Sequence, residues 1–259
     1  MKRLQLVEIE DLSWYPDRMR RGQTDFLRWM MGTFKVFEGV WPQLHDLSRQ
    51  AGKSQWIDLC SGGGGAILQW RDYLRKQGES FKVLLTDLYP NLTAFRYLDR
   101  LTQGDCQGMG QSVDATDLPE ELDGFLTIFN AFHHFPPAQA TAILSHAVDR
   151  RLPIAVLEPN DRSVWQLIAN TLSLPVLQFL VSPFISPFRW SRLLFTYLLP
   201  LIPLVTLWDG WVSVFRTYKP EEMRAMAEKA DPEQLFDWHI GRSRHPFGYV
   251  NYAFGVPKE

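Results

Sequence analysis

The stretch WIDLCSGGGGAILQW, residues 56–70, decides the fold. It begins as an apolar, strand-like run that includes Asp58, continues through the four glycines of residues 62–65, and then becomes apolar again. In an open α/β sheet, ligands bind beyond the carboxyl ends of the strands, and a glycine-rich turn lets them approach backbone N–H groups of the next helix. The sequence therefore predicts a ligand-binding turn after a first strand.

The pattern around this stretch alternates between strand-like and helix-like segments. Runs rich in β-branched and aromatic residues predict strands within 55–60, 81–88, 110–115, 124–132 and 152–159, and helical patterns fill 65–78, 91–103 and 137–151. Two further strands, within 234–242 and 249–257, are close enough to pair as a hairpin. The expected fold is α/β: a doubly wound, mostly parallel, seven-stranded Rossmann-like sheet with a C-terminal antiparallel hairpin.

The domain organisation follows from the same pattern. We expect an N-terminal helical cap in residues 1–50, a ligand-binding core in residues 51–162 and 219–259, and a helical apolar insert after the fifth strand in residues 163–218. The helix that resumes the core begins near Pro220.

Composition narrows the class of protein. A chain of 259 residues with 46% hydrophobic residues can bury a large core, and a net charge of −2 disfavours general nucleic-acid binding. One local feature keeps RNA as an alternative: Arg18, Arg20, Arg21 and Arg28 lie among aromatic residues, although an ordinary helix surface that closes over a ligand explains them as well. Two cysteines and the absence of a long apolar run at the start predict a cytoplasmic protein.

The glycines do not form the dinucleotide fingerprint G-x-G-x-x-G/A. Gly62 and Gly64 lead to Ile67, and the next register ends on Leu68. Asp87 closes the second predicted strand, where a carboxylate can accept both hydroxyls of a ribose. The sequence therefore indicates a ligand with a ribose, the alternative being that Asp87 only opens the turn DLYPN.

These residues resemble the class I S-adenosylmethionine-dependent methyltransferases. The family's acid-x-Gly-x-Gly-x-Gly signature corresponds to residues 58–64, with Cys60 in place of the first glycine. The resemblance covers residues 52–160 and the C-terminal tail, and it implies S-adenosylmethionine as the cofactor. The positions that it assigns to the cofactor are Asp58, Cys60, Ser61, Gly62, Gly63 and Gly64 along the methionine, Asp87 and Leu88 at the ribose, Asp114 and Ala115 at the adenine, and Asn130 and Ala131 at the end of strand four.

A general base is needed only if the acceptor loses a proton. His133 and His134 follow strand four, where a neutral imidazole suits this role near pH 7, and Glu158 is a further candidate. Each also has a structural interpretation, as a helix cap, a pocket wall or a group bound to backbone N–H. His245 could reach the same rim. We expect no metal site, because adjacent histidines on a strand point in different directions.

The insert contains two apolar runs, residues 167–188 and 193–208, that prolines interrupt. A simple membrane-spanning helix is therefore not expected, and the runs suggest a helical hairpin. Three interpretations remain open: a substrate lid that packs as extra core, the wall of a pocket for a lipophilic acceptor, and docking on a membrane with Arg189 and Arg192 toward the headgroups. The insert also offers a surface for an oligomer contact.

The sequence thus predicts methyl transfer from S-adenosylmethionine to a small, hydrophobic acceptor by a cytoplasmic enzyme, with association with a membrane as an open interpretation. Two alternatives stay open: an NAD(P)-dependent oxidoreductase, and a non-catalytic protein that keeps the cofactor site.

Overall fold

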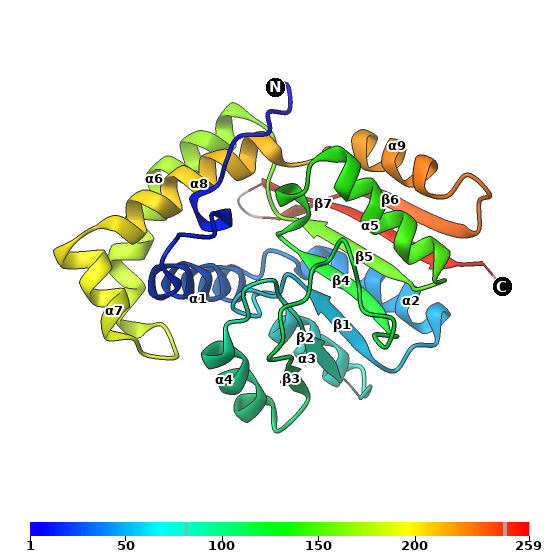
Figure 1. The fold of residues 1–259 in the computed structure, drawn as a ribbon, viewed down its shortest axis with the longest axis horizontal. Coiled ribbons are helices and arrows are strands. Elements are labelled where there is room, and N and C mark those ends of the chain that lie inside the picture. The colour runs from blue at the N-terminus through cyan, green and yellow to red at the C-terminus, as the bar shows by residue number, and fades with distance from the viewer. Residues whose placement is uncertain (81, 246–247, 259) are drawn as a thin grey trace.

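The computed structural model describes residues 1–80, 82–245 and 248–258 and confirms the predicted α/β sheet (Figure 1). Within these residues the sheet has seven strands in the order β3-β2-β1-β4-β5-β7-β6. The first five run parallel, whereas β7 pairs antiparallel with both β5 and β6. The strands are β1 (Trp56–Leu59), β2 (Val83–Leu85), β3 (Cys106–Gly108), β4 (Phe125–Phe129), β5 (Ile154–Glu158), β6 (Phe236–His245) and β7 (Gly248–Pro257). Phe81, at the start of the predicted second strand, and residues 246–247 lie outside the described residues.

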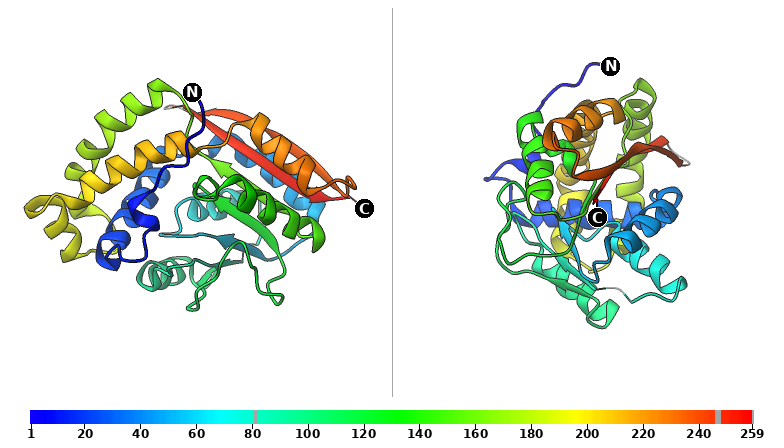
Figure 2. Two further views of the ribbon diagram at one scale, coloured as in Figure 1. Left: turned by 45° about the horizontal axis from the view of Figure 1, so that its top comes forward. Right: turned by 90° about the vertical axis from the view of Figure 1, so that its right-hand side faces the viewer.

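Helices cover both faces of the sheet, so the core has three layers (Figure 2). Side chains alternate between the faces along each strand: Trp56 and Phe125 pack in the cluster with α2, α3 and α4, while Ile57 and Leu126 pack in the cluster with α5 and α9. The helices of the core are α1 (Asp17–Phe34), α2 (Trp41–Ala51), α3 (Ile67–Lys76), α4 (Leu92–Thr102), α5 (Pro137–Asp149) and α9 (Pro220–Ala230), with short turns η1 (Ile9–Asp11), η2 (Glu38–Val40) and η3 (Phe132–His134).

The third strand lies earlier than predicted. The structure places it at Cys106–Gly108, and residues 110–115 form a loop beyond it. Val113 donates its N–H to the carbonyl oxygen of Asp87 at 3.0 Å and buries its side chain, which imitates the alternation of a strand. Asp114 accepts the N–H of Thr116 at 2.8 Å, so it forms a local turn rather than a strand end.

The insert forms the predicted helical hairpin, whose arms α6 and α8 lie side by side (Figure 1). Its elements are α6 (Val164–Val181), η4 (Ser182–Phe184), α7 (Trp190–Leu193), η5 (Leu194–Leu198) and α8 (Leu201–Arg216). Pro175 was expected to break the first arm, yet α6 continues through it and packs along α8. Near Pro200 the chain bends by 83° between residues 190–198 and 201–216, as the prolines predicted.

Arg189 and Arg192 hold the hairpin to α1. Their guanidinium groups approach the buried carboxylate of Asp25, with N···O distances of 2.6 Å from Arg189 and 3.2 Å from Arg192. Arg192 is completely buried. The expectation that these two arginines point toward lipid headgroups is therefore wrong, because the insert turns its own charges inward.

Candidate active site

A cavity of about 400 Å³ lies between α1 and the carboxyl ends of β1, β2 and β4. The structure brings most of the predicted cofactor positions and one predicted histidine together at its wall. These are Asp58, Cys60, Ser61, Gly62, Gly63, Asp87, Leu88, Asn130, Ala131 and His134. Gly64, Asp114 and Ala115 lie outside the lining. Asp114 and Ala115 belong to the loop after β3, which contacts Asp87 through the N–H of Val113.

The glycines of this turn lack side chains partly because neighbouring helices pack closely against them. A Cβ on Gly63 would lie 2.7 Å from the carbonyl oxygen of Thr24 in α1, and one on Gly64 would collide with Leu98 of α4. Gly62 faces the cavity, and its φ of +53° lies in the left-handed region. The turn therefore serves both the cavity and the close approach of two helices.

Cys60 adopts a φ of +55°, although it has a side chain. A left-handed conformation costs a residue other than glycine about 1–2 kcal/mol. We expect Cys60→Gly to raise the free energy of unfolding by about 1 kcal/mol, measured by urea denaturation. Cys60→Ala is the matched control, because it keeps the Cβ and the strain. An alanine variant at least as stable as the glycine variant would contradict the assignment of strain.

Two buried carboxylates shape the cofactor end of this cavity. Asp87 accepts the N–H of Gly62 and the N–H of Tyr89, each at 2.7 Å, and burial raises its pKa. Asp58 accepts the hydroxyl of Thr127 at 2.8 Å, and burial raises its pKa to about 7. Asp87 thus fixes the glycine turn to the end of β2 and still lines the cavity.

Arginines of α1 close the cavity from the other side. Arg20 and Arg28 are buried, and Arg20 lies with its guanidinium carbon 4.3 Å from the ring centre of Tyr89. Both line the cavity together with Arg21. The interpretation of this stretch as a helix that closes over a ligand agrees with these positions, while Arg18 is exposed. That the protein binds no nucleic acid stays a prediction.

A second cavity, of about 410 Å³, lies between α1, α6 and α8 and adjoins the first. Its wall is mostly apolar, and His245 reaches it from the end of β6. The two cavities share five lining residues: Glu10, Leu27, Met31, Asn130 and His134. A molecule in one cavity therefore meets a molecule in the other at these side chains.

Glu158 lies behind this junction rather than in it. It is fully buried, lines neither cavity, and binds His133 twice: Oε2 lies 2.6 Å from Nδ1, and Oε1 accepts the backbone N–H at 3.1 Å. The structure thus makes Glu158 a positioning residue for His133 and contradicts its assignment as a base in contact with a ligand.

Two carboxylates surround His134 and favour its protonated form. Its Nδ1 lies 2.6 Å from Asp11 Oδ1 and 3.2 Å from Glu8 Oε2. Burial would lower the pKa of His134, but the carboxylates of Glu8 and Asp11 outweigh it and raise the pKa to about 10. Burial likewise opposes a charge on His133, yet Glu158 raises its pKa. At His134 these carboxylates favour the protonated imidazole over the neutral form that a base needs, and a role of His133 as the base stays a prediction.

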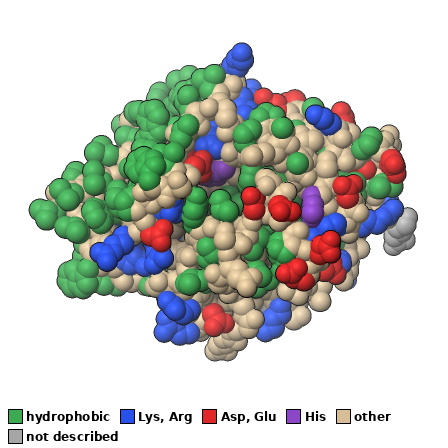
Figure 3. All heavy atoms as spheres, in the orientation of Figure 1, with side chains coloured by type: hydrophobic (Ala, Val, Ile, Leu, Met, Phe, Trp, Pro, Cys, Tyr) green, Lys and Arg blue, Asp and Glu red, His purple; other side chains and the backbone are tan. Residues whose placement is uncertain are grey.

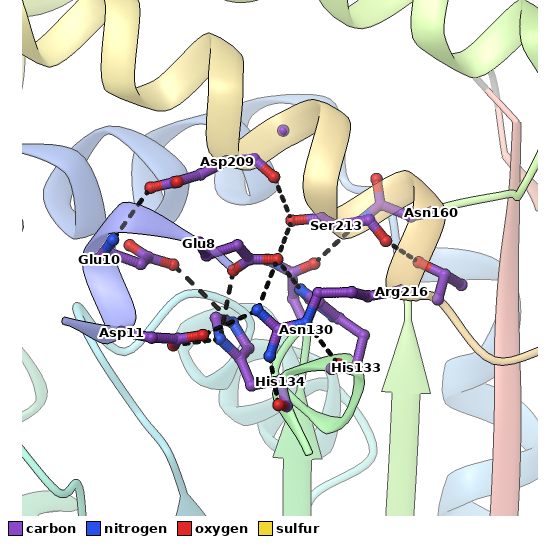
Figure 4. Close-up of polar contacts among 12 residues, drawn as sticks. Glu8, Glu10, Asp11, Asn130, His133, His134, Asn160, Asp209, Ser213 and Arg216 are labelled. Carbon is purple, nitrogen blue, oxygen red and sulfur yellow. Dashed lines mark hydrogen bonds and ion pairs between the residues drawn. The ribbon is translucent and has the colours of Figure 1, made fainter. Parts of the chain in front are cut away.

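The acids around these histidines were missed in the sequence. Glu8, Glu10 and Asp11 come from the N-terminal segment, and Figure 4 shows them beside His134. Helix α8 holds this segment in place, because Asp209 accepts the N–H of Ile9 at 2.6 Å and that of Glu10 at 3.3 Å. Arg216, also in α8, pairs with Asp11 at 2.8 Å. The one signal in the sequence is the acidic run EIED, and nothing local links it to residues more than 100 positions away.

The structure brings three possible metal ligands together. Ligand atoms of Glu8, His133 and His134 lie within 4.8 Å of one another. The argument from divergent histidines is wrong, because they occupy the turn η3 with ring centres 4.5 Å apart. In the structure the guanidinium of Arg216 approaches Glu8 at 3.5 Å, so the carboxylate of this cluster already has a cationic partner. That the chain uses no metal stays a prediction.

No protein-family model and no curated protein matches the sequence. Solved structures match the fold. The methyltransferase domain of bacterial CtHen1 aligns with a TM-score of 0.50 and 11% identity over 85% of this chain and 99% of that chain. Magnesium protoporphyrin IX methyltransferase from Synechocystis PCC 6803 aligns with a TM-score of 0.49 and 14% identity over 88% and 84%, and the plantazolicin methyltransferase BpumL with 0.49 and 11% over 93% and 96%. The strand order, the antiparallel last pair and the match to the CtHen1 domain lead to one conclusion: this chain has the fold of the class I S-adenosylmethionine-dependent methyltransferases.

Proposed function

We propose that the protein transfers a methyl group from S-adenosylmethionine to a small, hydrophobic acceptor. The observation that carries the proposal is the pair of adjoining cavities. One is lined by the glycine turn and buried carboxylates, the other is mostly apolar, and they meet at Glu10, Asn130 and His134. Methyl transfer needs two ligands aligned end to end with water excluded, which this arrangement supports.

The residues at the first cavity suit the cofactor. A carboxylate is the acceptor that ribose hydroxyls need, and Asp87 offers one at the end of β2. The turn at Cys60 to Gly63 and the buried Asp58 would lie along the methionine, whose positive sulfur favours nearby acids. When bound, the cofactor supplies a methyl group on a good leaving group, so the protein needs mainly to orient it.

Glu10 is the residue that we assign to the acceptor's proton. It lines both cavities, its Oε1 lies 3.8 Å from His134 Nε2, and its buried Oε2 has no hydrogen-bond partner among the described residues. Burial raises its pKa to about 8, close to the value that serves a base at neutral pH. An acceptor hydroxyl at the junction would give its proton to this carboxylate as its oxygen attacks.

Two alternatives are separable by binding. An NAD(P)-dependent oxidoreductase is disfavoured by the missing G-x-G-x-x-G/A pattern, and a non-catalytic protein would bind the cofactor without transfer. Calorimetric titration with S-adenosylhomocysteine and, separately, with NADH tests the first choice. Binding of the first alone supports the proposal, whereas binding of NADH alone, or of neither, refutes it.

Asp87→Ala is expected to weaken binding of S-adenosylhomocysteine by on the order of 2–4 kcal/mol, about 30-fold to 1,000-fold, because it removes charge-assisted hydrogen bonds to the ribose. Calorimetry measures the change. Asp87→Asn keeps the size and shows how much is due to charge, and Asp123→Ala, at an exposed ion pair with Lys53, is the control that should leave affinity unchanged. Equal affinity of Asp87→Ala and the wild type would make Asp87 a turn residue only.

A further inference from the structure

The outer face of the α6–α8 hairpin is an unusually apolar surface. Figure 3 shows hydrophobic side chains gathered over this end of the molecule, around α6, α7 and α8. Soluble monomers seldom expose a contiguous apolar patch of this kind. The most exposed side chains, each between 64% and 80% accessible, are Trp165, Leu172, Leu180, Phe184, Trp190 and Leu198.

Helix α6 carries mostly polar side chains on its buried face and apolar side chains on its exposed face. The buried positions of α6 recur every four residues and include Gln166, Asn170 and Gln178. Gln166 donates to the side-chain oxygen of Asn170 at 2.9 Å, and Asn170 donates to the carbonyl oxygen of Gly210 in α8 at 3.0 Å. A helix on a water-soluble surface has the opposite arrangement, with its polar face outward. The exposed face of α6 is thus suited to an apolar solvent.

Charge is missing from the same face. Residues 163–208 contain two charged side chains, Arg189 and Arg192, and both turn inward to Asp25. Among the described residues, the segment 164–184 is long and apolar enough to cross a membrane, with only 17% of its most apolar window buried, and the bent pair 190–198 and 201–216 passes the same test when taken together. A core helix of a soluble protein would be mostly buried.

We propose that the hairpin inserts this outer face into one leaflet of a lipid bilayer. Both of its ends, at Ser163 and Arg216, join the same core, which keeps the core on one side of the membrane. The apolar side chains cover a projecting end of the molecule (Figures 1 and 3), and lipid can surround a projection, whereas a second copy of the chain would cover one side of it.

The second cavity opens toward this surface. Trp165, Ile168 and Leu172 are exposed on the outer face of α6 and also line the cavity. A lipophilic acceptor could pass from the bilayer to the junction at His134 without crossing water. This step, which names the acceptor as a membrane-resident lipid, rests on the proposed function, whereas docking itself does not.

Flotation with vesicles of phosphatidylcholine and phosphatidylglycerol tests the docking. The wild type is expected to float, and Phe184→Glu/Trp190→Glu/Leu198→Glu to partition at least about 10-fold less, because charged side chains at the inserted end oppose burial in lipid. Leu198→Glu and Leu101→Glu form a matched pair: both leucines are exposed, but Leu101 lies on α4, so only the first should weaken binding. In vesicles with brominated acyl chains, the tryptophan fluorescence of the wild type should be quenched, and Trp190→Phe should lack the part of this quenching that is due to Trp190.

Three results would overturn the docking. The wild type could fail to float, or the triple variant could float like the wild type. Without vesicles, the wild type could be a dimer and the triple variant a monomer. The last would assign the surface to a second copy of the chain. Two assays separate the proposals: flotation of the wild type tests docking, and titration of the triple variant with S-adenosylhomocysteine tests cofactor binding. If S-adenosylhomocysteine binds but the wild type does not float, docking alone is refuted. If the wild type floats but S-adenosylhomocysteine does not bind, the proposed function alone is refuted.

Discussion

Glu10→Gln is expected to slow methyl transfer about 10²-fold to 10⁴-fold, the usual contribution of a positioned general base. The amide keeps the size of the side chain but cannot take up the acceptor's proton at the junction of the two cavities. Transfer of tritiated methyl groups from S-adenosylmethionine into a lipid extract measures the rate. Affinity for S-adenosylhomocysteine should stay within a factor of about two, since Glu10 is not assigned to the cofactor.

The pH dependence makes this prediction specific. Glu10 acts as a base only when it is deprotonated, and burial raises its pKa to about 8. The wild-type rate at low substrate concentration should therefore rise about tenfold per pH unit below 8 and level off above it. Glu10→Gln should lose this rise. A structural role alone would lower the rate at every pH and leave the shape of the profile unchanged.

Glu38→Gln is the control, because Glu38 is an exposed glutamate that lines neither cavity and should leave rate and profile unchanged. A Glu10→Gln enzyme that keeps the wild-type profile would contradict the assignment. The base would then have to be another group, or the acceptor would need none.

The cofactor end of the site was predictable because parallel strands bring their carboxyl ends to one edge. Asp58 lies near the end of β1, Asp87 follows β2 and Asn130 follows β4, and the structure places all three at one cavity. The prediction of a strand at residues 110–115 was wrong, because their alternation of buried and exposed side chains belongs to a loop that does not pair with a neighbouring strand. Local periodicity alone does not distinguish these two cases.

The acceptor end was predictable only in part. His133 and His134 are in place, but their protonation depends on Glu8 and Asp11, whose contact with η3 joins segments more than 120 residues apart. The hydropathy of the insert indicated an apolar surface. Which side chains face outward depends on the packing of α6 on α8, and so does the inward turn of Arg189 and Arg192.

Asp25→Ala is expected to lower the free energy of unfolding by about 3–5 kcal/mol, as breaking a buried ion pair usually does. The carboxylate of Asp25 is completely buried and pairs with Arg28, Arg189 and Arg192. Its removal would leave three guanidinium groups beside one another at the contact between α1 and the hairpin, with Arg192 fully buried and without its carboxylate. Urea denaturation measures the loss, and proteolysis within residues 185–199 should become faster.

Asp17→Ala is the matched control in the same helix. Asp17 also pairs with two arginines, Arg20 and Arg21, but its side chain is 63% exposed, so its loss should change the free energy of unfolding by at most about 1 kcal/mol. The difference between the two variants isolates burial, because both remove one carboxylate from α1. If both cost the same, Asp25 does not hold the hairpin, and the inward turn of Arg189 and Arg192 contributes no stability. A large loss at Asp25 alone would show why an insert with an apolar exterior keeps two arginines: they anchor it to the helix that closes both cavities.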